Sequence, residues 1–194
     1  MKYLVSYSKR KTISLRIIDE NTVKISAPNS ANREVIEKFV LSKKSWIQKK
    51  ISLLNKLNNK FDDVINGNKI CLFGEIINFS GNKSKYLNEI AEEYLPKRIK
   101  ELSILYNLKY NGLKLKNYKS KWGQCDKQRN ITLNKKLIFL NREVIDYIIL
   151  HELCHTLYMN HQKNFHKKLS SLVNNEAQLI KQLKEYSILI KYKL

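Results

Sequence analysis

All four histidines of the 194-residue chain lie between His151 and His166. Within this window, the run His151-Glu152-Leu153-Cys154-His155 has the pattern H-E-x-x-H. Residues four apart lie on one face of a helix, so both imidazoles can point at a single metal ion. Glu152 follows the first histidine and can reach a metal-bound water as a general base. The motif therefore predicts both a helix at this place in the fold and a catalytic metal centre on it.

The residues around the motif are typical of a core helix. Asn141 can cap its first turn, and Glu143 suits the positive end of the helix dipole. From Val144 to Leu157 the apolar residues recur at helical spacing. The pattern predicts a helix over about 142–159.

A third metal ligand is expected from His161. Met159 ends the helical pattern, and Asn160 tolerates the left-handed backbone that can reverse a chain. His161 would then return toward the ion, and three neutral imidazoles with one open position are typical of a catalytic zinc site. We therefore expect one Zn²⁺ per chain. His166 is interpreted as a packing or surface residue.

The first third of the chain has the patterns of strands followed by a long helix. Alternating or β-branched residues predict three strands, over Tyr3–Tyr7, Thr12–Ile18 and Thr22–Ala27. Pro28 ends the last of them, and Asn29 or Ser30 is expected to cap a helix from about Asn32 to Asn58. Trp46 falls on the apolar stripe of that helix and is expected in the core.

The rest of the chain mixes short strands with helices. A hairpin is expected around Gly74, and a helix over about 84–108 contains Pro96, which could kink or divide it. Strands are expected over Leu113–Tyr118 and Ile131–Leu133 on either side of a loop over 120–126, and further helices over 163–173 and 176–190. This order predicts an α+β protein. We expect an amino-terminal α+β region over 1–83 and a domain carrying the motif over 84–194, together forming one compact unit.

The chain is strongly basic, with 37 lysine and arginine residues against 17 acidic ones and a net charge of +20. Lysine accounts for 31 of the basic residues, and with the abundant asparagine and isoleucine this indicates an AT-rich coding bias as readily as selection for a partner. No apolar run approaches the roughly 18 residues of a membrane helix. Charges at 9–11 argue against a signal peptide.

The three widely spaced cysteines argue for a reducing, cytoplasmic compartment. Cys71 and Cys154 are interpreted as core residues. Cys125 is less easily assigned, because its loop precedes the strand expected to border the metal centre.

Several segments together resemble the YgjP-like metal-dependent hydrolases. They are Lys121-Trp122-Gly123-Gln124-Cys125, Ile131-Thr132-Leu133-Asn134, Val144-Ile145-Asp146-Tyr147, the H-E-x-x-H run and Asn160-His161 with Phe165. The resemblance implies a zincin-like metallopeptidase domain, with zinc held by His151, His155 and His161 and with Glu152 as the base. The chain has Lys121, Gln124 and His166 where the family usually has Arg, Ser and Trp.

The first functional hypothesis is a zinc-dependent peptidase. The second group that stabilises the oxyanion could be Lys121, Tyr158 or Asn134, and the sequence does not decide among these substrate-binding candidates. An extended peptide substrate would pair with an edge strand over Asn130–Asn134.

Two alternatives stay open. A metal-dependent nucleoside triphosphate hydrolase would find basic residues near the site at Lys119, Lys121, Lys135 and Lys136, although no Gly-rich phosphate loop is visible. A nucleic-acid-associated module has the net charge as its main support, which the compositional bias weakens.

Overall fold

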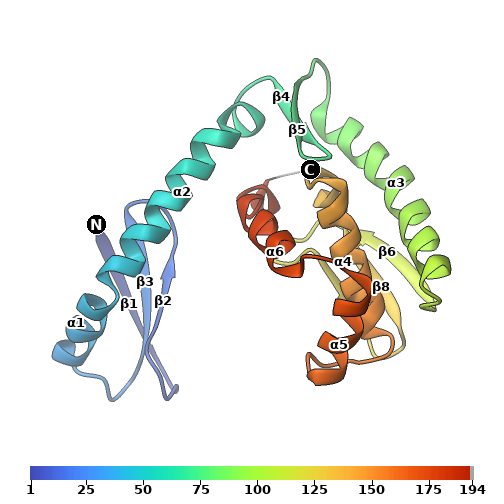
Figure 1. Ribbon diagram of the computed structural model, residues 1–194. Helices are drawn as coiled ribbons and strands as arrows, with labels where there is room; N and C mark the ends of the chain where they lie inside the picture. Colours follow the sequence, from blue (N-terminus) through green and yellow to red (C-terminus); the bar gives the residue numbers. More distant parts are fainter. Residues whose placement is uncertain (193–194) are drawn as a thin grey trace. The chain divides into compact units, whose positions relative to one another are not determined.

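The computed structural model describes residues 1–192 and divides into two compact units, Met1–Lys60 and Phe61–Leu194 (Figure 1). The division falls within one long helix, and each unit is described by itself. The sequence-based division into 1–83 and 84–194 stays a prediction about folding domains. In the part of the chain described, no helix is long and apolar enough to cross a membrane.

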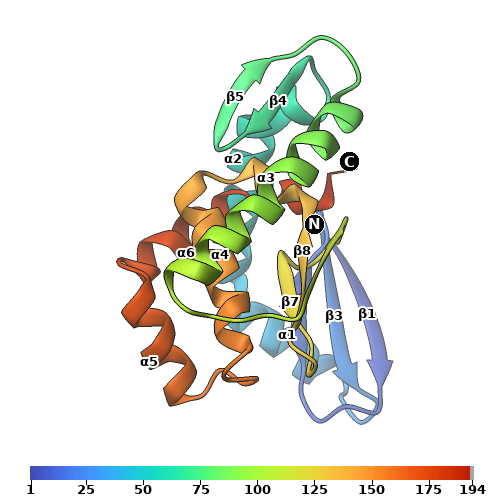
Figure 2. The same ribbon diagram turned by 90° about the vertical axis from the view of Figure 1, so that its right-hand side faces the viewer.

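The amino-terminal unit is a three-stranded sheet with helices packed on one face. Strands β1 (Lys2–Ser8), β2 (Ser14–Ile17) and β3 (Thr22–Pro28) are arranged in the order β1-β3-β2, so β1 lies at one edge (Figure 2). The β1 strand is parallel to β3, and β2 is antiparallel to it. These three strands confirm the sequence-based prediction. Ile25 and Ala27 of β3 pack with Ile36 of the first helix to form a small core.

The long helix predicted over 32–58 is in fact two helices, α1 (Arg33–Ser42) and α2 (Lys44–Ile65). The Ser42 hydroxyl donates to the Phe39 carbonyl at 2.7 Å, the group that the Lys43 N–H would use in a continuous helix. The Lys43 N–H bonds Val40 instead, and the helix is interrupted there.

Two further details of this unit differ from the prediction. The cap of α1 is Asn32, whose side chain accepts from the Val35 N–H, because the residues directly after Pro28 form a turn. Trp46 is 43% exposed, whereas its neighbour Ile47 is buried. Trp46 therefore lies outside the buried stripe of α2, and the expectation that it is a core residue is wrong.

In the carboxy-terminal unit, the end of α2 is followed by the predicted hairpin of β4 (Lys69–Leu72) and β5 (Glu75–Asn78). Phe73 and Gly74 both have positive φ, which is the turn geometry that matches the twist of a two-residue hairpin. Helix α3 (Lys83–Leu105) follows and runs through Pro96 without division.

A second three-stranded sheet supports the site. It comprises β6 (Gly112–Lys116), β7 (Gly123–Cys125) and β8 (Asn130–Asn134) in the order β6-β8-β7. Strand β7 was predicted as loop, but it pairs antiparallel with β8. Because β8 is paired on both sides, the expectation that Asn130–Asn134 forms an edge strand is wrong.

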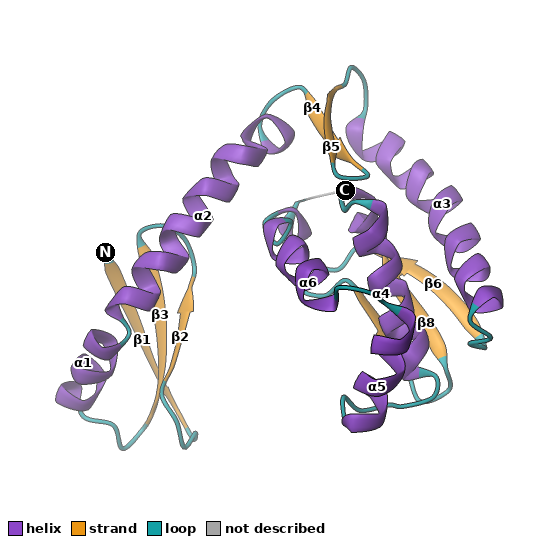
Figure 3. Ribbon diagram, viewed as in Figure 1, coloured by secondary structure: helices purple, strands orange, loops and turns teal. Residues whose placement is uncertain are grey.

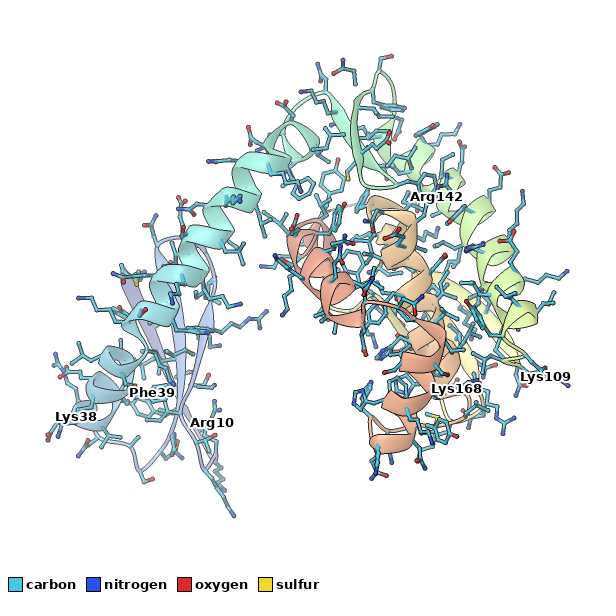
Figure 4. All side chains as sticks on the ribbon, viewed as in Figure 1. Arg10, Lys38, Phe39, Lys109, Arg142 and Lys168 are labelled. Carbon is cyan, nitrogen blue, oxygen red and sulfur yellow. The ribbon has the colours of Figure 1, made fainter. Side chains whose placement is uncertain are left out.

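Helices complete this unit, namely a short 3₁₀ helix η1 (Lys135–Phe139), α4 (Arg142–His155), α5 (Lys163–Leu172), α6 (Glu176–Glu185) and the 3₁₀ helix η2 (Leu189–Lys191). Ten of the fourteen residues of α4 are buried, so this helix forms the centre of the unit. Its first residue, Arg142 (labelled in Figure 4), places its guanidinium 4.1 Å from the ring centre of Phe73. A bidentate ion pair joins α3 to α4: Nε and Nη2 of Arg98 donate to the two carboxylate oxygens of Asp146 at 2.7 and 2.6 Å. The predicted α+β class is confirmed.

Candidate active site

The last two turns of α4 carry the H-E-x-x-H motif. The helix begins at the predicted cap, where the Asn141 side chain accepts from the Val144 N–H at 3.2 Å. It ends at His155, the second histidine of the motif. His151 and His155 are therefore on one face of a buried, well-anchored helix, with ring centres 5.0 Å apart.

The chain turns back after α4 and brings His161 to the other two histidines. The Nε2 atoms of His151 and His161 lie 3.0 Å apart, and one ligand nitrogen from each of the three residues lies within 4.8 Å of the others. Nitrogen ligands about 2.0–2.1 Å from a tetrahedral zinc ion are themselves about 3.3 Å apart. The donor set therefore fits a zinc ion.

The route of this return differs from the one predicted. The helix ends at His155 rather than near Met159, and Asn160 does not have a left-handed backbone. Because the helix ends earlier, the segment over 156–162 is long enough to reverse without such a residue. His166 is exposed, its ring centre is 6.3 Å from that of His161, and it is outside the three-histidine group.

Phe165 forms the floor of the histidine cluster. This fully buried side chain comes from α5, which lies beside the end of α4 (Figure 3). Its ring centre is 4.9, 4.6 and 4.7 Å from those of His151, His155 and His161. Apart from its place in the family resemblance, Phe165 has no role predicted from the sequence. Its spacing from Leu169, the other buried residue of α5, is the signal that could have identified an inward-facing stripe.

A backbone carbonyl orients one of the candidate ligands. The Nδ1 atom of His155 lies 3.0 Å from the carbonyl oxygen of Tyr158. With Nδ1–H as the donor, the other ring nitrogen, Nε2, is left free to bind a metal. Burial and the neighbouring histidines lower the pKa of His151 to about 4, so its imidazole is neutral near pH 7, as a metal ligand must be.

The side chain of Glu152 projects from α4 and packs against β7. It is 6% exposed, and burial raises the pKa of its carboxyl to about 7, while the positive charge of Lys121 opposes that rise. A Cβ on Gly123 would lie only 2.7 Å from Cγ and Oε1 of Glu152. The absence of a side chain at Gly123 thus makes room for the carboxylate beside the histidines.

These groups share one cleft of about 300 Å³. Its walls come from β7, the end of α4 and the returning segment, and are formed by Gly123, Gln124, Cys125, His151, Glu152, His155, Met159 and His161. The three histidines and Glu152 thus open onto a common space that a substrate can enter.

The substrate-binding candidates differ in their positions. Lys121 is exposed just before β7, where its ammonium bonds the Gln124 side chain and lies 4.6 Å from the ring centre of Tyr118. Neither Lys121 nor Tyr158 is among the residues that line the cleft, and the carbonyl of Tyr158 contacts His155 instead.

Asn134 is fully buried and its amide is used within the protein. The amide nitrogen donates to the carbonyls of Tyr118 and Lys121, and the oxygen accepts from the Lys136 N–H. Asn134 therefore holds the segment before β7 in place and does not face the cleft.

The lysines invoked for a triphosphate substrate are partly engaged elsewhere. Lys135 forms a 2.6 Å ion pair with Glu92. Lys136 is buried and donates to the carbonyls of Tyr118 and Ile190. These two ammonium groups therefore already have partners within the protein.

The three cysteines are poorly suited to act as catalytic nucleophiles. Cys71 and Cys154 are buried, as predicted. Cys125 lines the cleft, but burial, with a further contribution from Glu152, raises the pKa of its thiol to about 11. A thiol with such a pKa is protonated near neutral pH and is a poor nucleophile.

An H-E-x-x-H motif on a helix, with a third histidine beside it, is typical of metal-dependent hydrolases. The chain belongs to the YgjP-like family: the family model described as "YgjP-like, metallopeptidase domain" matches residues 11–85 and 81–186.

Solved structures of two metallopeptidase zymogens are similar to part of the chain. Jannalysin of Methanocaldococcus jannaschii is 26% identical, with 45% of this chain and 95% of that chain covered and a TM-score of 0.39. Abylysin of Pyrococcus abyssi is 16% identical, with 51% and 98% covered and a TM-score of 0.42. A search of curated proteins gave no match.

Proposed function

We propose that the protein is a zinc-dependent peptidase in which His151, His155 and His161 hold the metal and Glu152 is the general base. The observation that carries this proposal is the convergence of three imidazole nitrogens within 4.8 Å of one another, with Glu152 in the same cleft. Membership of the YgjP-like metallopeptidase family supports it.

The donor set favours zinc. Neutral imidazoles suit zinc and several other transition metals, and three of them with one open position are typical of catalytic zinc. A zinc ion held there would lower the pKa of a water and polarise a substrate carbonyl. Glu152 would take the proton from the attacking water and deliver it to the leaving amine.

The free edge of β7 suits an extended peptide. This strand pairs with β8 on one side, and no described strand pairs with its other side. Its residues, Gly123 to Cys125, also form one wall of the cleft. Backbone pairing with β7 would place a peptide carbonyl beside the histidines and Glu152, whatever the peptide's side chains. Strand β7 therefore replaces Asn130–Asn134 as the proposed substrate edge.

Lys121 is the best placed of the three oxyanion candidates. None of the three lines the cleft, but the Lys121 ammonium bonds the side chain of Gln124, which does, and its positive charge opposes the rise in the pKa of Glu152. The amide of Asn134 is buried and used within the protein. We propose that Lys121 stabilises the developing oxyanion.

The alternatives gain no support. The metallopeptidase family does not point to nucleotides or nucleic acid. Two of the four lysines proposed for triphosphate already have partners in the protein.

The test is to incubate the zinc-loaded protein with an unfolded protein and, separately, with nucleoside triphosphates. We expect peptide-bond cleavage that is lost in Glu152→Gln, with the products identified by mass spectrometry. Hydrolysis of triphosphate alone would overturn the peptidase proposal, as would cleavage of the unfolded protein that is unchanged in the variant.

A further inference from the structure

One face of strand β1 is left uncovered in the amino-terminal unit. The register pairs Tyr3 with Val23, Val5 with Ile25 and Tyr7 with Ala27, and paired residues project from the same side of a sheet. The three β3 residues are at most 1% exposed, because the helices cover them. Their β1 partners are 43–54% exposed. The helical layer therefore covers β3 but stops short of β1.

This uncovered face of β1 borders an apolar groove of about 640 Å³ between β1 and α1. The β1 side is formed by Tyr3, Val5 and Tyr7, and the α1 side by Ile36, Val40 and Leu41. The charged residues of its lining, Arg33 and Glu37, are joined by a 2.7 Å ion pair. The groove therefore offers apolar surface without an unmatched charge.

The strand beside this groove has a free backbone edge. Strand β1 is outermost in the β1-β3-β2 sheet, and its second edge pairs with no strand among residues 1–192 (Figure 2). Such an edge presents a row of N–H and C=O groups ready to pair with another chain. A free edge next to an apolar groove is the arrangement in which an added strand gains both backbone hydrogen bonds and pockets for alternate side chains.

The charges around β1 indicate an acidic occupant. Lys2 begins the strand and Lys9, Arg10 and Lys11 follow it, whereas residues 1–18 contain no acidic residue. Residues 1–60 hold 14 lysines and arginines against four acidic residues, and both acids of α1 are ion-paired within the helix. A second copy would bring these same cations together, which is unfavourable.

We propose that the groove between β1 and α1 binds an extended polypeptide segment that adds to the free edge of β1. Alternate apolar side chains of that segment would fill the groove, and acidic residues at its two ends would face the cations that flank β1. The site consists only of amino-terminal residues and does not depend on the proposed hydrolase activity.

The test measures binding of a fluorescent synthetic peptide to the full chain carrying Glu152→Gln, so that cleavage does not interfere. The peptide is as long as β1, alternates valine with threonine and carries paired glutamates at both ends. Two neighbouring residues of β1 provide a matched pair of variants. Val5 faces the groove and Leu4 faces the opposite side of the sheet, and they are 43% and 42% exposed. Val5→Lys is expected to weaken binding roughly tenfold or more, whereas Leu4→Lys changes it less than about twofold.

A second pair on α1 keeps the test decisive if Val5→Lys disturbs the strand. Leu41 lines the groove and is 68% exposed, so Leu41→Lys should fold normally and lose binding. Val35→Lys, on an exposed α1 residue outside the lining, should not. Circular dichroism checks the fold of every variant.

Modified peptides test the mode of binding. N-methylation of the backbone at alternate positions should abolish binding when it blocks one edge of the peptide and spare it when it blocks the other. Replacing the terminal glutamates with lysines should weaken binding by about tenfold or more. Equal losses in Val5→Lys and Leu4→Lys, or equal tolerance of both methylation patterns, would overturn the proposal. Absence of peptide binding together with self-association that Val5→Lys abolishes would assign the groove to a second copy instead.

Discussion

Gly123 and Glu152 are in such close contact that no side chain fits between them. A Cβ on Gly123 would lie 2.7 Å from both Cγ and Oε1 of Glu152, and 2.9 Å from Cδ. The strand β7 thus forms the wall against which the proposed base rests. The position of the carboxylate depends on the glycine as well as on its own place after His151 in α4.

The first prediction is that Gly123→Ala displaces the Glu152 carboxylate and lowers turnover. A displacement of about 1 Å in a reacting group can cost on the order of a hundredfold in rate. Zinc content should stay near that of the parent protein, because the three atoms nearest to such a Cβ all belong to Glu152. Steady-state kinetics and elemental analysis check both points. Ser120→Ala, on an exposed residue just before the site, is the control, and a rate loss of the same size in that variant would contradict this interpretation.

The second prediction concerns the metal. The purified protein should contain about one zinc per chain, and His151→Ala, His155→Ala and His161→Ala should each lose it, because each removes one of three converging nitrogens. His166→Ala should keep the metal, since His166 is outside the cluster and exposed. Elemental analysis after extensive dialysis distinguishes the variants. Metal loss in His166→Ala with retention in His161→Ala would reverse the ligand assignment.

A third prediction separates chemistry from metal binding. Glu152→Gln is nearly isosteric and should keep both the fold and the zinc, but the amide cannot accept a proton from water. Positioned general bases contribute roughly 10²–10⁴-fold. We expect a loss in kcat within this range on any substrate that the parent protein cleaves, with zinc content unchanged. A near-normal kcat would remove Glu152 from the role of base.

Phe165 gives a fourth prediction, because it contacts all three histidine rings from a fully buried position. Phe165→Ala should lower the free energy of unfolding by about 3–5 kcal/mol and weaken zinc binding through the loosened imidazoles. Denaturant unfolding and competition with a chelator measure the two effects. Phe165→Leu keeps more of the volume and should lose less of both. Equal zinc affinity in all three proteins would show that the ring supports the fold alone.

Local patterns in the sequence sufficed to predict the parts of the fold that depend on short-range chemistry. The three amino-terminal strands, the hairpin at Gly74 and the Asn141 cap all follow from periodicity, turn residues or capping side chains, and all are confirmed. The convergence of His151, His155 and His161 was likewise predictable, because two of them share a helix face and the third follows closely. Their role as zinc ligands stays a prediction.

The errors arose where contacts distant in sequence decide the structure. Strand β7 is only three residues long and is a strand because β8 pairs with it, which no local pattern reveals. The same pairing makes β8 central and moves the proposed substrate edge to β7. Asn134 was a polar candidate for the cleft, but its side-chain amide donates hydrogen bonds to backbone carbonyls more than ten residues earlier in the chain. Trp46 was misplaced because it lies beside the buried stripe of α2, next to Ile47, and apolar spacing alone does not reveal where that stripe ends.

The last prediction concerns the acid stability of the β7–β8 turn. The Asp126 carboxylate accepts from the Gln128 N–H at 2.9 Å and from the backbone and side chain of Asn130 at 2.9 and 3.0 Å. These bonds, chiefly those from Asn130, lower the pKa of Asp126 below its ordinary value. A carboxyl whose pKa is lower in the folded state stabilises the protein above its unfolded pKa, about 3.9, and this stabilisation disappears as the pH falls through the folded pKa. The free energy of unfolding should therefore exceed that of Asp126→Asn at pH 7, and the difference should shrink steadily below about pH 4. Denaturant unfolding at a series of pH values measures this difference. Glu20→Gln, which changes an exposed carboxyl in the amino-terminal unit, is the control. A difference that stays constant with pH, or one that grows in acid, would show that the charge of Asp126 does not stabilise this turn.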